Sequence, residues 1–156
     1  GKPKPLPRVD LAALAPLEFS PETSEALRAE IGRLVERISD LWTPPRVMGA
    51  ALKRLKEIGY HGVPAVINLT LKLDYATRDG VQHGAILFML LKDMCNSTGV
   101  EFNSAYNKTF EAEAWENDYD IAWNQNAVKA WHRYWTEFGS SRQLWEEKIA
   151  IKRREK

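Results

Sequence analysis

The chain has very little cysteine, since Cys95 is the only one in 156 residues. A single thiol cannot close an intrachain disulfide, so the sequence excludes the disulfide framework of small secreted domains. Cys95 follows an apolar run and has no adjacent basic residue that would favour its thiolate. We therefore expect an inert, buried thiol rather than a nucleophile.

Long apolar runs and an excess of one charge are also missing. The longest apolar run, Ala85 to Leu91, is far shorter than the roughly 20 residues that a membrane span needs. Lys and Arg number 22 against 21 Asp and Glu, so the chain lacks the basic footprint typical of nucleic-acid-binding proteins. Its length and its 44% apolar content still suffice for the core of one soluble domain.

Residue patterns that carry chemistry are scarce as well. His61, His83 and His132 fall in different expected elements, and none has a metal-ligating partner three or four positions further on. No G-x-x-x-x-G-K-[ST] loop is present, so we expect no nucleotide site of that kind. The sequence therefore predicts a non-catalytic protein with no metal and no cofactor, although a hydrolase without a recognisable motif stays open as an alternative.

The first 19 residues are unlike the rest, because they hold four of the eight prolines. They also contain six large apolar residues, too many for a free linker. We predict that residues 1–19 form an extended Pro-rich arm, lying against a partner or along the groove of the chain's own first helical hairpin. Residues 20–156 are predicted to form one helical-repeat domain with a capping helix at its C-terminus.

Apolar residues recur at spacings of three and four from residue 20 onward, and no segment alternates with period two. This pattern predicts an all-α fold of about seven helices and no strands. The expected helices cover residues 20–42, 44–58, 63–75, 81–95, 103–115, 118–138 and 140–151.

Capping and stop signals set the expected helix boundaries. Ser20, followed by Pro21, predicts the start of the first helix, and Gly59 predicts the end of the second. Asp79-Gly80 predicts a break between the third and fourth helices. Either Ser140 or Ser141 can cap the last helix.

One helical register appears twice, 39 residues apart, as Ile67-Asn68-Leu69-Thr70-Leu71 and Tyr106-Asn107-Lys108-Thr109-Phe110. Lys92-Asp93-Met94 ends the helix between them. These residues resemble the pentatricopeptide repeat family, in which the first helix of a unit often reads Tyr-Asn-Thr-Leu-Ile and the second often ends in Glu-Met. The resemblance implies a pentatricopeptide-like α-solenoid, a right-handed stack of helix-turn-helix hairpins.

The size and character of the chain are similar to those of the small accessory subunits of mitochondrial F1-ATPases in kinetoplastid protists. That resemblance implies a non-catalytic structural subunit of the F1-ATP synthase, bound through protein–protein contacts to the outer side of the alpha subunit. It also implies a location on the matrix side of the inner membrane and a cleaved presequence that is not part of this sequence.

Two residue sets could serve recognition. Most of the six tryptophans are expected in the core, but Trp123 and Trp145 are predicted to anchor a partner, because tryptophan is enriched at interface hot spots. The alternative function is that of an organellar RNA-binding pentatricopeptide repeat protein, whose first-helix polar residues read bases. Asn68 and Asn107 stand where such residues would lie.

Overall fold

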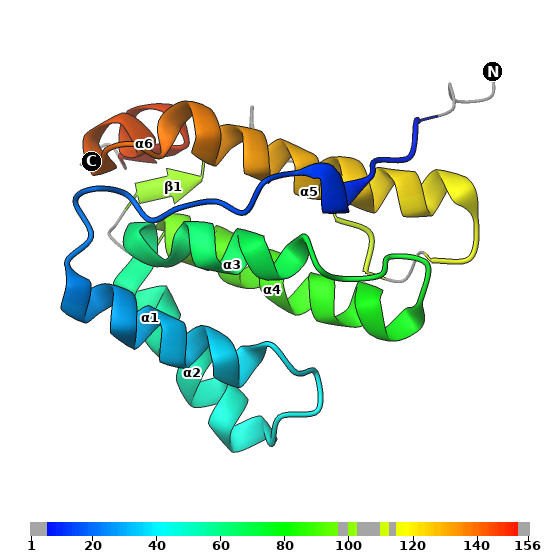
Figure 1. Ribbon diagram of the computed structural model, residues 1–156, viewed down its shortest axis with the longest axis horizontal. Coiled ribbons are helices and arrows are strands. Elements are labelled where there is room, and N and C mark those ends of the chain that lie inside the picture. The colour runs from blue at the N-terminus through cyan, green and yellow to red at the C-terminus, as the bar shows by residue number, and fades with distance from the viewer. Residues whose placement is uncertain (1–5, 97–99, 103–109, 113–114, 153–156) are drawn as a thin grey trace.

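The computed structural model describes residues 6–96, 100–102, 110–112 and 115–152, and its framework is helical (Figure 1). Six α-helices form within these residues: α1 (Glu25–Ile38), α2 (Pro45–Ile58), α3 (Val63–Thr70), α4 (Arg78–Asn96), α5 (Asp118–Phe138) and α6 (Arg142–Lys148). The short 3-10 helices η1 (Leu11–Ala13) and η2 (Gly59–Gly62) complete the helical set. The helical character predicted from the sequence is confirmed.

The predicted count of seven helices is not reproduced in the described residues. Most of the fifth expected helix, over residues 103–115, lies outside them, and its described parts, 110–112 and 115, are not helical. Two three-residue strands, β1 (Val100–Phe102) and β2 (Ala150–Lys152), pair antiparallel. Strands this short contain too few residues for a period of two to be recognised.

Helix ends follow local chemistry where a cap or stop residue is present. Gly59 ends α2 with a φ of 64°, a conformation that glycine adopts at little cost. Ser141 caps α6 by accepting a hydrogen bond from the backbone N–H of Leu144, as expected for one of the two candidate serines. The predicted start at Ser20 is wrong, because Ser24 caps α1 by accepting from the N–H of Leu27.

The predicted break at Asp79-Gly80 is also wrong, since both residues lie in the first turn of α4. Thr77 precedes this helix, and its hydroxyl accepts a hydrogen bond from the Gly80 N–H at 3.0 Å. Gly80 is required for another reason: a Cβ at this position would overlap the backbone carbonyl of Asp74. The glycine therefore permits a close approach of two backbones instead of ending a helix.

The helices form two layers. Helix α3 packs between α1 and α5 in one layer, while α2 and α4 pack together in the other (Figure 1). Helices α1 and α2 form one antiparallel hairpin, and α3 and α4 form the next. Helix α5, expected to be the second helix of a third hairpin, instead lies beside α3 in the first layer.

Aromatic side chains fill the core between the layers. Phe88 of α4 stacks on Phe110 with ring centroids 4.5 Å apart and meets the Trp131 ring edge-on at 6.5 Å. Among the residues that the structure describes, every buried side-chain nitrogen and oxygen has a hydrogen-bond partner. The Tyr75 hydroxyl donates to the Thr70 carbonyl at 2.7 Å. A ring nitrogen of His83 lies 2.8 Å from the carbonyl oxygen of Ile38, which ties α4 to the end of α1.

Candidate functional site

The described part of the N-terminal arm, residues 6–19, lies across the chain's own α3 and α5 (Figure 1). Leu17 donates its backbone N–H to the Asn68 side-chain oxygen at 2.8 Å, and the Asn68 amide nitrogen donates to the Leu17 carbonyl at 2.9 Å. Asn68 belongs to α3, so this segment lies against α3 and α5 and not in the groove of the first hairpin. The prediction that the arm lies along the groove of the first hairpin is therefore wrong for residues 6–19.

Helix α5 holds the arm at several further points along its length. Four further contacts reach the backbone of the arm, from Asn126 to the Pro7 carbonyl, Gln125 to the Val9 N–H, His132 to the Ala15 carbonyl and Trp135 to the Glu18 carbonyl, at 2.8–3.1 Å. The Arg8 side chain also donates to Asp118 of α5 at 2.7 Å. Leu11 is only 8% exposed and joins the core. An extended chain is thus accepted on this surface because side chains of α3 and α5 satisfy its backbone groups.

Of the two asparagines proposed to read RNA bases, only Asn68 lies within the described residues. Both polar atoms of the Asn68 side chain are occupied by Leu17, so this amide is not presented to a base. Asn107 lies outside the described residues. Among the described residues, the RNA-binding alternative depends on Asn68. This residue has a structural role instead, because it holds Leu17.

The two tryptophans proposed as partner anchors also differ. Trp145 is 1% exposed and lies against the ring of Trp135 at a centroid distance of 5.3 Å. Its role as a surface anchor is therefore corrected: the indole belongs to the core that joins α5 and α6. Trp123 is half-buried on α5 and tilts against Tyr119 at 6.1 Å, so it stays a candidate contact residue.

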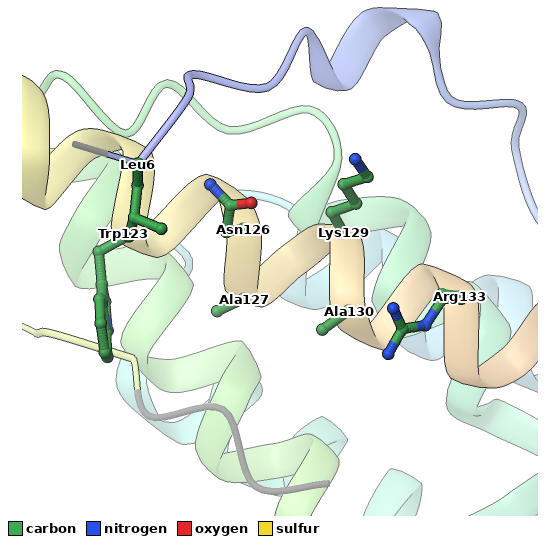
Figure 2. A pocket seen from close by; sticks show the side chains of 7 residues that line it. All are labelled: Leu6, Trp123, Asn126, Ala127, Lys129, Ala130 and Arg133. Atoms are coloured by element: carbon green, nitrogen blue, oxygen red, sulfur yellow. The ribbon is translucent and has the colours of Figure 1, made fainter. Parts of the chain in front are cut away.

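Trp123 lines a hollow of about 310 Å³ on the surface of α5. Figure 2 shows Leu6 and Trp123 at one end, Ala127 and Ala130 along the middle, and Arg133 at the other end. Arg133 lies within 3.7 Å of Glu137 in an exposed ion pair one helical turn away. The hollow is therefore a shallow apolar site whose arginine already has an acidic neighbour.

A larger groove, of about 460 Å³, separates α2 from α4 in the second layer. Its walls are made by Leu52, Lys53 and Lys56 of α2 and by Ile86, Met89, Leu90 and Asp93 of α4. Met89 is 68% exposed, although it lies in the longest apolar run of the chain, Ala85 to Leu91. Sequence reasoning missed it because a wholly apolar run does not reveal which residue faces outward.

Trp42 is a second exposed residue that the sequence did not single out. It is 76% exposed in the turn between α1 and α2, although it was predicted to continue the apolar stripe of the first helix. Its N–H donates to the Asp40 side chain at 2.9 Å, which fixes the turn. The signal that could have found it was the turn-forming pair of Asp40 and Pro44 on either side.

Groups with catalytic potential are engaged in structural contacts. The Thr23 hydroxyl lies 2.8 Å from Nδ1 of His61, but Thr23 is buried. Burial raises the pKa of the Cys95 thiol, which makes the reactive thiolate rare. Within the described ranges, no three His, Cys, Asp or Glu side chains gather in a way that could hold a metal ion.

Over the helices that the structure describes, none is both long and apolar enough to cross a membrane. Comparison of the chain with protein-family models, with curated proteins and with solved structures finds no match. The functional argument therefore rests on the surfaces described above.

Proposed function

We propose that this chain is a non-catalytic structural subunit of the mitochondrial F1-ATP synthase. In this proposal it binds the outer side of the alpha subunit through protein–protein contacts made by the α2–α4 groove. The observation that carries the proposal is the exposed apolar side chain of Met89 above a groove of about 460 Å³. Exposed apolar grooves with polar rims are typical of surfaces that bind other proteins.

The order of the helices supports the repeat interpretation on which the proposal draws. Stacked hairpins bring successive first helices together in one layer and successive second helices together in another. Helices α1 and α3 lie in one layer and α2 and α4 in the other, as two stacked hairpins would place them, whereas α5 lies beside α3 instead of in the second layer. Such an array presents extended surfaces to partners, which agrees with a structural subunit.

The experiment separates a subunit from an RNA-binding protein. The tagged protein is expressed in mitochondria of the source organism, and detergent extracts are run on native gels with and without nuclease. We expect co-migration with the ATPase assembly and no effect of the nuclease. Migration in a nuclease-sensitive particle, or absence from the ATPase assembly, would reject the proposal.

A pair of matched variants tests the groove itself. Met89→Asp places a carboxylate in the apolar groove and should reduce co-migration with the ATPase. Trp42→Asp makes the same kind of change in the turn between α1 and α2, where the side chain is also exposed, and should leave co-migration intact. Equal loss in both variants would mean that the α2–α4 groove has no special role.

A further inference from the structure

The rim of the α2–α4 groove carries charges that the chain itself does not neutralise. Lys53 and Lys56 lie on the α2 side, and neither forms a salt bridge with another described residue. Arg54, between them, is instead directed to α1, where it donates to Glu30 at 2.7 Å. The α2 wall therefore offers two lysines to whatever enters the groove, whereas the α4 wall offers Asp93.

Gly49 extends this surface by one helical turn beyond Leu52 and Lys53. A Cβ added at Gly49 would meet nothing within 4 Å, so no neighbour in this chain requires a glycine there. Glycine inside a helix nevertheless costs about 1 kcal/mol relative to alanine. A bare backbone at this position allows another main chain to approach α2 closely, as small residues do at helix–helix contacts.

The arm shows what an extended ligand needs on this protein. Its backbone groups are satisfied by side chains of α3 and α5 that include Asn68, Gln125 and Asn126. The α2–α4 groove has no Asn, Gln, His or Trp in its lining. Lys53 and Lys56 could donate to carbonyl groups there, but Asp93 is the one side-chain acceptor in the lining, so most N–H groups of an extended segment buried in the groove would lack a partner.

A helix avoids that cost, because its backbone hydrogen bonds are made within itself. We propose that the α2–α4 groove receives an amphipathic α-helix of a partner protein, with acidic side chains on the flank that faces Lys53 and Lys56. The apolar stripe of this helix lies over Leu52, Ile86 and Met89, as in the helix-in-groove mode of recognition. The identity of the partner as an F1 subunit rests on the proposed function above.

Site-specific cross-linking identifies the occupant. The photoreactive residue p-benzoylphenylalanine replaces Met89 in the full chain, and the complex with purified F1-ATPase is irradiated and analysed by peptide mass spectrometry. We expect adducts on one helix that has apolar residues at three- and four-residue spacing and acidic residues on one side. The same group at exposed Lys72, beyond the end of α3, is the control and should not reach that helix.

Charge reversal tests the acidic flank. The double variant Lys53→Glu with Lys56→Glu should weaken F1 binding at least ~10-fold, and the loss should shrink at high salt. Arg33→Glu with Lys72→Glu changes the net charge equally at exposed positions outside the groove, and it should leave binding within about twofold. Reversal of the acidic residues identified by the cross-link should restore binding to the Lys53/Lys56 double variant.

The outcomes distinguish this inference from the proposed function. If the chain binds F1 but position 89 cross-links to a strand, a loop, lipid or nothing, the helix is rejected while the subunit proposal stands. Equal effects of the two double variants would reject the acidic flank. Failure of the unaltered chain to bind F1 at all would reject the subunit proposal, together with this inference about its partner.

Discussion

Asn68 and Leu17 are joined by a reciprocal pair of hydrogen bonds, at 2.8 and 2.9 Å, in which the side chain of one meets both backbone groups of the other. Asn124 of α5 makes the same arrangement with the backbone of Glu111, at 2.9 and 3.1 Å. In each case a side-chain amide on a helix pairs with the N–H and C=O of one extended residue, as a neighbouring strand would. Extended segments are thereby fixed to helices that cannot otherwise pair with them.

The first prediction concerns this amide. Asn68→Ala removes both hydrogen bonds to Leu17 and should lower the free energy of unfolding by about 1–3 kcal/mol, because Leu17 is left with unpaired backbone groups. Hydrogen exchange at the Leu17 amide should accelerate. Gln82→Ala removes an exposed amide on α4 and should change stability by less than about 0.5 kcal/mol. Unchanged exchange at Leu17 would contradict the bond.

Two tryptophans allow one substitution to be compared in opposite environments. Trp145→Ala empties a buried site against Trp135 and should cost about 3–5 kcal/mol in urea unfolding. Trp42→Ala removes a side chain that is 76% exposed and should cost less than about 0.5 kcal/mol. Similar losses of unfolding free energy at the two positions would show that the Trp42 side chain is packed against the protein and not exposed.

Two glycines inside helices are predicted to respond with opposite signs. Gly49→Ala fills open space on α2 and should stabilise the free protein by about 0.5–1 kcal/mol, because alanine is the better helix former. Gly80→Ala drives a methyl group into the Asp74 carbonyl and should destabilise the protein by more than that gain. Thermal unfolding of both variants decides the matter, and stabilisation by Gly80→Ala would disprove the close approach.

The sequence predicted best those features that depend on neighbouring residues. The end of α2 at Gly59 and the cap of α6 at Ser141 follow from backbone conformation and one side-chain bond, both local. The start of α4 was misplaced because Asp-Gly is common in turns. Here glycine is required because the Asp74 carbonyl lies too close to position 80 for a side chain. Residue propensities do not include such a tertiary contact.

The exposed residues were harder to predict for a different reason. An apolar stripe shows that a helix has a buried face, but the tertiary packing decides which individual side chain is left outside. Trp145 is buried against α5, whereas Trp42 lies beyond the end of α1 and has most of its surface exposed. The path of the arm depends on contacts between residues 51 to 119 positions apart, such as those of Asn68 with Leu17 and of Trp135 with Glu18. Periodicity carries no information about such pairings.

The last prediction concerns stability as a function of pH. His61 belongs to η2 and is partly buried, and Nδ1 of its ring lies 2.8 Å from the hydroxyl of Thr23, which precedes α1. Desolvation, reinforced by Arg142 and opposed by Glu22, lowers the pKa of His61 below its ordinary value of 6.5. The neutral ring is therefore the form that the fold favours.

The sign follows from proton linkage. Because the unfolded chain binds this proton more tightly, the stabilisation is complete above the unfolded pKa of 6.5 and is lost as the pH falls toward the lowered folded pKa. Urea unfolding between about pH 7.5 and 5 should show stability declining below about pH 6.5. In His61→Gln, which keeps a polar side chain without this titration, the decline should be shallower over the same range. Identical slopes in the two proteins would show that His61 does not contribute to the pH dependence.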